Sequence, residues 1–479
     1  MRRRRLGGCA AGLGAALALA CGAPSFLAPP PAWELPAPAP EDRPVVDADS
    51  VTRVALDNGL SVLIHEDHRL PRVSLSLTVR RGAAFESPEE AGAVSFMSEL
   101  LERGAGERDA LAFAEEVDAL GARFSTGADW DSVGVGISGL SRDLDLLLEL
   151  FADAALRPRF ETRDAERSRA ELLAALERAK DDPATLASWH ASRAIYGTHR
   201  FALPVNGTPE TVARFDAATA RDLHARLFVP RGAILAVTGD VEPDAVLAAL
   251  RKRFAGWPEA EVAPPGAPPP ARAPEARRVV VVDQPDLGQA RIVVGHEGIS
   301  RTDEDRIALS LFNLVIGGSG FSSRLMIALR SEEGLTYGVG SGYALRRAPG
   351  PFYVSTFTRV EELRRALDIL MAELERAKAE PPGEEELSWA RTLATGQFAL
   401  GLETSEAVTD ALVDLDVYAL PEDSLDTYRR RVRALTAEEV AAAGRAHLHP
   451  ERAAIVLVGP AEAIVPQLEG LGPVEVVAP

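Results

Sequence analysis

Residues 92–104 read GAVSFMSELLERG. Apolar side chains recur there at steps of three and four residues, at Val94, Met97 and Leu101, and this spacing is typical of a helix that buries one face. By the same geometry, the polar residues of the stretch share the other face: Ser95, Ser98, Glu99 and Glu102. We therefore predict an amphipathic helix over Ala91–Arg103 with an apolar core stripe.

The same stretch follows Arg81-Gly82-Ala83 and Glu86-Ser87, and together they resemble the zinc helix of the insulinase, pitrilysin and mitochondrial-processing-peptidase family. That helix carries His-x-x-Glu-His, in which the two histidines hold zinc and the glutamate activates a water molecule. A distal glutamate on a following helix is the third ligand. In this sequence the four matching positions are Ser95, Ser98, Glu99 and Ala175.

The distal position is assigned from Asp181-Asp182-Pro183, which resembles the end of the family's ligand helix and places the ligand at Ala175. Glu171 is one helical turn away, but its use would break that alignment. Zinc needs thiolate, imidazole or carboxylate ligands, so Glu99 alone cannot hold the ion. The resemblance therefore implies a chain with no zinc ion, no general base and no cofactor of its own.

Histidines elsewhere do not indicate a second metal site. The run His65-Glu66-Asp67-His68 ends a predicted strand, and His447 and His449 precede Pro450, so we interpret both groups as surface turn residues. The other histidines are single and scattered: His190, His199, His224 and His296. Neither a Ser-His-Asp arrangement nor a Gly-x-Ser-x-Gly elbow is indicated.

A glycine-rich run, IGGSGFSSRL at residues 316–325, is followed by LRSEEGLTY at residues 329–337. A nucleotide site is excluded, because no Gly-Lys-Ser/Thr ending is present and the glycines follow a predicted helix, Glu304–Val315, rather than a strand. The run is very similar to the second-domain signature of the same family. There, an arginine and a tyrosine seven residues apart face the active site.

This second resemblance implies two catalytic groups, Arg330 and Tyr337, which have that spacing. It also implies a substrate-binding loop made of Gly317, Gly318, Ser319, Gly320 and Phe321. An alternative interpretation remains open, in which Arg330 neutralises a helix C-terminus and Tyr337 packs with its hydroxyl at the surface.

The rest of the chain is organised as two similar halves. With 479 residues, two or more domains are expected at roughly 100–200 residues each. A Pro/Ala-rich stretch, Ala263–Pro274, separates the halves, and the buried strands Ala233–Val237 and Ala454–Val458 occupy matching places near their ends. Further strands are predicted at Val51–Ile64, Arg72–Val79, Arg278–Val282 and Gln289–Gly295, and long helices at Leu144–Ala154, Thr162–Lys180 and Val360–Lys378.

The predicted fold class is α+β: two homologous α/β-sandwich domains, each a mixed, largely antiparallel sheet with helices packed on it. The family resemblance covers residues 50 to about 470, includes Asn206-Gly207-Thr208-Pro209-Glu210, and implies half of a peptidase chamber. The predicted segments are a signal peptide at 1–20, a Pro/Ala-rich tether at 21–49, domains at 50–258 and 277–475, and a Pro-rich linker at 259–276.

The N-terminus carries a targeting signal. Arg2–Arg5 precede an apolar stretch, Leu6–Ala20, which is shorter than the about 20 residues of a membrane-spanning helix. Ala18-Leu19-Ala20-Cys21 resembles a bacterial lipobox, which implies lipidation of Cys21 and a periplasmic lipoprotein, at the outer membrane of the cell envelope. An ordinary signal peptide cleaved near Ala23 is the alternative. Cys9 and Cys21 are the only cysteines, so the folded part forms no disulfide.

Charge and motifs together define the expected function. The formal net charge of -19 disfavours nucleic acid as a partner. We expect a non-zinc subunit of a heterodimeric metallopeptidase that binds peptides, inactive alone, with zinc in a homologous partner. The alternative is a catalytically inactive scaffold or binding protein, like the core subunits of respiratory complexes that share this fold. A self-sufficient peptidase would need ligands that the sequence lacks.

Overall fold

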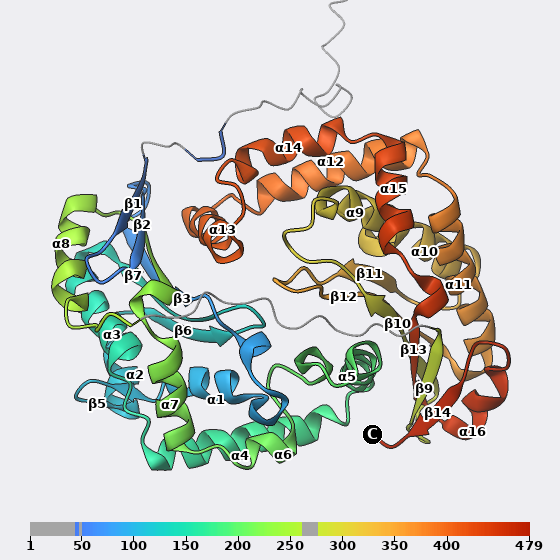
Figure 1. Cartoon of the computed structure of the whole chain (residues 1–479), viewed down its shortest axis with the longest axis horizontal. Coiled ribbons are helices and arrows are strands. Elements are labelled where there is room, and N and C mark those ends of the chain that lie inside the picture. Colours follow the sequence, from blue (N-terminus) through green and yellow to red (C-terminus); the bar gives the residue numbers. More distant parts are fainter. Residues whose placement is uncertain (1–43, 47–49, 261–275) are drawn as a thin grey trace, which may run out of the picture. The chain divides into compact units, whose positions relative to one another are not determined.

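Two six-stranded mixed sheets organise the computed structural model, which describes residues 44–46, 50–260 and 276–479 (Figure 1). Cys21, the signal segment, and most of the tether and the linker lie outside the described residues. The first sheet has the order β1-β2-β8-β3-β7-β6 and the second β11-β12-β10-β13-β9-β14. Five strands of each sheet therefore follow one pattern, in which β2-β8-β3-β7-β6 matches β9-β13-β10-β12-β11.

The strands of the first sheet are β1 (Val51–Ala55), β2 (Ser61–Glu66), β3 (Arg72–Val79), β6 (Arg123–Ala128), β7 (Val133–Leu140) and β8 (Ala233–Gly239). Those of the second are β9 (Arg278–Asp283), β10 (Gln289–Glu297), β11 (Val339–Tyr343), β12 (Pro351–Arg359), β13 (Ala454–Gly459) and β14 (Val474–Val477). A short hairpin pairs β4 (Gly104–Ala105) with β5 (Arg108–Asp109). Most pairs are antiparallel, whereas β8 lies parallel to β2, and β9 lies parallel to both β13 and β14.

The helices of the first half are α1 (Ala93–Leu100), α2 (Ala110–Ala119), α3 (Leu144–Leu156), α4 (Thr162–Ala179), α5 (Pro183–Tyr196), α6 (Pro209–Val212), α7 (Ala217–Leu227) and α8 (Pro243–Phe254). Those of the second are α9 (Arg306–Asn313), α10 (Arg324–Met326), α11 (Leu363–Ala379), α12 (Glu384–Leu400), α13 (Ser405–Tyr418), α14 (Ser424–Ala434), α15 (Ala437–His447) and α16 (Ala461–Ile464). Among the described residues, no helix combines the length and the apolar character that crossing a membrane requires.

Side-chain caps fix several of these helix starts. Asp182 accepts hydrogen bonds from the backbone N–H groups of Ala184 and Thr185 at the start of α5, where Pro183 occupies the first turn. Thr436 and Glu439 form a capping box at the start of α15. These caps satisfy the free N–H groups of the first turn and thereby fix the residue at which each helix begins.

The two halves exchange one helix each. In the second sheet, Val279 and Val281 of β9 join the core formed with the helices of their own half, whereas Val280 and Val282 pack in a cluster with Leu186 and Ile195 of α5. In the first sheet, Leu63, Ile234 and Ala236 pack in the same way against Val408, Leu412 and Leu415 of α13. Both faces of the central strands are therefore covered, which explains their continuous apolar sequences.

The α+β prediction is confirmed, with two corrections to its elements. The stretch Val51–Ile64 is not one strand but two, β1 and β2, joined by a turn at residues 56–60 with Gly59 at φ +84°. The predicted helix Glu304–Val315 begins at Arg306 and continues as a π-helical turn over Leu314–Gly318. The alternating strands β6, β7, β11 and β12 were not predicted.

Candidate functional site

Helix α1, at the position of the zinc helix, is held at its N-terminus by a buried ion pair. Glu86 accepts hydrogen bonds from the backbone N–H groups of Gly92, at 3.1 Å, and Val94, at 2.6 Å. Arg200 donates to the same carboxylate at 2.6 and 3.0 Å, and the side chains of Arg200 and Glu86 are only 4% and 2% exposed. Because a buried charge needs a partner, Glu86 and Arg200 together fix where α1 starts.

Ser95 and Ser98 do not lie on an open polar face. Ser95 is 9% exposed and donates a hydrogen bond to Asn206 Oδ1 at 2.9 Å, while Ser98 is 3% exposed and its hydroxyl has no partner among the described residues. Helix α1 is in contact with α4 and α7 as well as with β6, so neighbours cover most of its circumference. Of the four residues on the predicted polar face, Ser95 and Ser98 are therefore buried, Glu99 is half-buried and Glu102 is exposed.

A guanidinium group occupies the region between α1 and α4. Arg103 donates to Glu171 at 3.0 Å, and Arg167 donates to the same carboxylate at 2.8 Å. Burial raises the pKa of Glu99; Arg103 opposes this shift, while the negative charges of Glu171 and Glu102 add to it. Arginine side chains thus compensate the negative charge of the acidic groups near α1.

The donor set at the four zinc positions does not fit zinc. It supplies one carboxylate, from Glu99, two serine hydroxyls, and the methyl group of Ala175, which is exposed on α4. In the described ranges, only Asp303, Asp305 and His447 bring three metal-ligand groups together. They lie just before α9 and at the end of α15, and His447 pairs with Asp305 at 2.9 Å. Asp305 is exposed, whereas Asp303 and His447 are half-buried.

The histidines interpreted as turn residues are placed differently from one another. His68 is exposed and lies between Glu66 and Asp240, each at 2.7 Å. His65 instead belongs to β2 and contacts Thr409 of α13 at 3.1 Å, so its side chain faces the exchanged helix. The backbone N–H of His449 donates to the buried His296.

The glycine-rich loop is fixed to β11 of the second sheet. Ser341 of that strand donates to Asn313 Oδ1 at 2.7 Å, and the Asn313 amide donates back to the Ser341 carbonyl at 3.1 Å. A side chain at Gly317 would place its Cβ 2.5 Å from the Ser341 hydroxyl, so this approach requires glycine. Gly320 then turns the chain with φ +68°. Gly318 and Ser319 lie between these two points, and the Ser319 hydroxyl has no partner among the described residues.

Arg330, Tyr337 and Phe321 come together as one exposed cluster. The Arg330 guanidinium lies 4.6 Å from the centroid of the Tyr337 ring and 4.5 Å from that of Phe321. The two rings are 76% and 68% exposed, which is unusual for aromatic side chains in contact with a cation. Within the residues that the structure describes, the Arg330 nitrogens make no hydrogen bond or ion pair, so they are open to a ligand.

Three pairings of this region were not predicted from the sequence. The Phe321 ring, which is predicted to bind substrate, contacts Arg330. The Asn206 side chain, which lies in a matching segment without an assigned role, accepts a hydrogen bond from Ser95. Glu86 pairs with Arg200, which is 114 residues away in the sequence. Contacts of this kind leave no periodic signal in the sequence.

Comparisons with known proteins agree with this architecture. Residues 61–209 match the model of the insulinase family, peptidase family M16, and residues 214–393 match the model described as the peptidase M16 inactive domain. The chain is 28% identical to an uncharacterized zinc protease of Mycobacterium tuberculosis, covering 85% of this chain and 93% of the relative. It is 26% identical to an uncharacterized zinc protease of Streptomyces coelicolor, covering 86% and 90%.

Solved structures also share this fold. A crystal structure described as a peptidase M16 inactive domain from Pseudomonas fluorescens superposes with a TM-score of 0.80 at 28% identity, covering 86% of this chain and 98% of that one. A protease from Helicobacter pylori superposes with a TM-score of 0.78 at 19% identity, covering 86% and 99%, and supports the fold alone.

Proposed function

This chain belongs to the insulinase family of M16 peptidases, and we propose that it is the zinc-free subunit of a heterodimeric metallopeptidase in the cell envelope. It binds and positions peptides, while a homologous partner brings the zinc ion. One observation carries the proposal: Arg330 is held between two exposed rings with its nitrogens open to a ligand, although the zinc positions of the same chain hold Ser95, Glu99 and Ala175. The chain therefore presents an accessible guanidinium, whereas its residues at the zinc positions do not fit zinc.

The chemistry of the cluster fits a supporting role in peptide hydrolysis. The carbonyl oxygen of a scissile peptide bond gains negative charge as the transition state forms, and fixed donors near it lower the barrier. The Arg330 guanidinium and the Tyr337 hydroxyl are both donors. Neither can activate water as a metal does, so the zinc of the partner would supply the nucleophile.

The cell-envelope assignment rests on Cys21, which lies outside the described residues. In this proposal the mature chain begins with an acylated Cys21. Several acyl chains would be needed for stable attachment, because a single chain gives marginal binding. Mass spectrometry of the N-terminus of protein from the membrane fraction tests this point. An unmodified terminus at Gly22 or beyond would exclude the anchor.

A scaffold is the second candidate function. It is favoured by the position of Arg330 in the last turn of the π-helical segment Ile327–Glu332, where a cation also stabilises the helix end. In that case the Tyr337 ring serves only to cover the guanidinium.

Co-expression decides between the two functions. This chain would be produced together with a homologous chain from the same genome that carries His-x-x-Glu-His, and peptide hydrolysis would be measured for each chain and for the mixture. We expect activity from the mixture that greatly exceeds that of either chain. A stable complex whose activity equals that of the zinc-bearing chain alone would favour the scaffold.

A further inference from the structure

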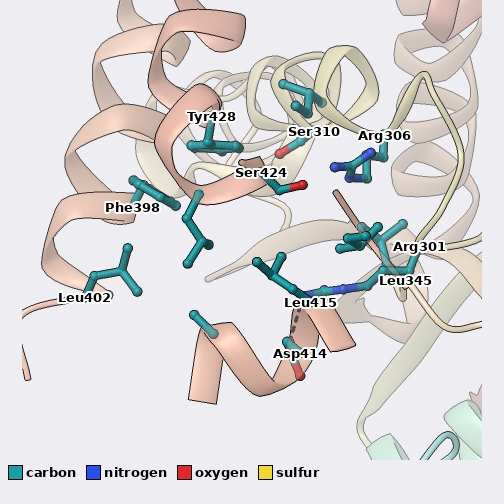
Figure 2. Close-up of a pocket in the computed structure, with 15 residues that line it drawn as sticks. Arg301, Arg306, Ser310, Leu345, Phe398, Leu402, Asp414, Leu415, Ser424 and Tyr428 are labelled. Carbon is teal, nitrogen blue, oxygen red and sulfur yellow. Dashed lines mark hydrogen bonds and ion pairs between the residues drawn. The ribbon is translucent and has the colours of Figure 1, made fainter. Parts of the chain in front are cut away.

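A separate pocket of about 380 Å³ lies in the second half of the chain, among α9, α12, α13 and α14 (Figure 2). Its volume is in the range of small-molecule sites, which run from about 300 to 1,000 Å³. The walls are largely apolar, with Phe398 and Leu402 on one side and Leu345 and Leu415 on the other. None of the residues of the Arg330 cluster lines it.

One end of the pocket carries a cation that forms no ion pair with any described residue. Arg306, the first residue of α9, makes a single long hydrogen bond of 3.5 Å to the backbone carbonyl of Asp303. The carboxylate in the pocket, Asp414, pairs instead with Arg301 at 2.9 Å. Burial lowers the pKa of Arg306, the neighbouring cations Arg431 and Arg301 lower it further, and Asp303 and Tyr428 oppose the shift. A half-buried guanidinium among other cations is a place where an anion is stabilised.

A second polar group at the same end also lacks a partner. Ser424 begins α14, and its buried hydroxyl makes no hydrogen bond to any described residue. Figure 2 shows Ser424 and Arg306 both directed into the pocket. Because buried polar atoms are normally hydrogen-bonded, an unpartnered hydroxyl and a cation without an ion pair that line the same pocket indicate a ligand that accepts from both.

We propose that this pocket binds a small amphiphilic carboxylate. Its head accepts hydrogen bonds from Arg306 and Ser424, and its apolar part lies among Phe398, Leu402 and Leu415. A medium-chain fatty acid and the apolar C-terminal residue of a short peptide share this chemistry. The site does not depend on the proposed peptidase role, because it shares no residue with the Arg330 cluster.

Calorimetric titration of the full chain at neutral pH tests the proposal with four probes. Decanoate and N-acetyl-Leu-Leu carry the carboxylate, and decanol and N-acetyl-Leu-Leu amide are their uncharged counterparts. We expect at least one carboxylate to bind at one site per chain and its counterpart to bind at least tenfold more weakly. Decanoate alone would identify a lipid source, N-acetyl-Leu-Leu alone a peptide source, and both would support the shared chemistry.

Two variants and one control locate the site. Arg306→Met removes the charge, and the loss of a charged hydrogen bond should weaken binding by roughly 10- to 100-fold. Ala411→Phe keeps the charge but fills the pocket from α13, and should abolish binding. Arg445→Met removes an exposed arginine of α15 and should change nothing. The proposal is overturned if neither carboxylate binds, if each carboxylate that binds is matched by its uncharged counterpart, or if both pocket variants bind like the native chain.

Discussion

The Arg330 guanidinium lies 4.6 Å from the centroid of the Tyr337 ring, and the Phe321 ring lies on the same cation at 4.5 Å. Contacts of this kind contribute about 0.5–1 kcal/mol at exposed sites, enough to favour one position of a long side chain. They use the face of each ring and leave the N–H groups and the phenol hydroxyl available. The pair therefore combines a fixed position with free donors, as transition-state stabilisation requires.

Tyr337→Phe removes the hydroxyl and retains the ring, so it tests the role of the hydroxyl alone. We expect turnover by the assembled peptidase to fall by about 10²–10³-fold, the usual cost of losing one such donor. The ring remains against Arg330, so the melting temperature and assembly should stay near those of the native chain. Tyr353→Phe, on an exposed tyrosine of β12, is the matched control and should leave turnover unchanged. Equal activities of both variants would make Tyr337 structural.

Phe321→Ala tests whether the Phe321 ring positions the Arg330 guanidinium. Removing one ring should weaken the positioning of Arg330 and reduce kcat/KM by roughly two- to fivefold, in line with the loss of one exposed cation–π contact. Arg330→Ala should reduce kcat/KM much more, because it removes the donor itself. If Phe321→Ala were as damaging as Arg330→Ala, the ring would contact substrate directly.

The Glu86–Arg200 pair should dominate the stability of the first half. Glu86→Gln leaves a buried guanidinium without a counter-charge, and we expect the free energy of unfolding to fall by about 3–5 kcal/mol in urea denaturation. Glu177→Gln breaks the exposed Glu177–Lys180 pair and should cost less than about 1 kcal/mol. Similar losses in the two variants would show that the buried pair does not hold α1.

His224 should make the fold sensitive to acid. Burial lowers the pKa of His224 from 6.5 to about 4, and the ring stacks on Phe228 while its Nε2–H donates to the Ala155 carbonyl. As the pH falls from about 6.5 to 4, the unfolded chain binds a proton that the folded chain does not. The free energy of unfolding should therefore decrease over this pH range, by up to about 3 kcal/mol through His224.

Urea denaturation of the native chain and of His224→Gln at pH 7.5, 6 and 5 checks this. The amide can still donate to Ala155 but does not titrate, so the variant should lose less stability on acidification. The buried His296, whose pKa is also lowered to about 4, remains in both proteins and cancels in the comparison. Parallel losses would contradict the role of His224.

The periodicity of apolar residues in the sequence was sufficient to locate strands and helices that bury one or both of their faces. The strand β3 and the helices α3 and α4 lie where their patterns predicted them. Periodicity also located α1 and its apolar stripe, but it could not show that neighbouring helices would bury Ser95 and Ser98 as well. It also could not show the exchange of α5 and α13, since the apolar stripe of a helix does not specify which sheet it contacts.

For the candidate site, the sequence predicted only the residue types and their spacing along the chain. The seven-residue interval between Arg330 and Tyr337 follows from the sequence, but their contact depends on the turn at Gly334, which has φ +61°. The pocket around Arg306 had no signal in the sequence. Its cation is unpaired because Asp414, on a helix more than 100 residues later, is already used by Arg301.

This chain should have no zinc site of its own. Metal analysis of the purified full chain, combined with peptide hydrolysis before and after chelation, is the decisive measurement. We predict no stoichiometric zinc and no chelator-sensitive activity, because Ser95, Glu99 and Ala175 cannot complete a site. One tightly bound zinc ion per chain, whose removal abolishes hydrolysis, would contradict the account.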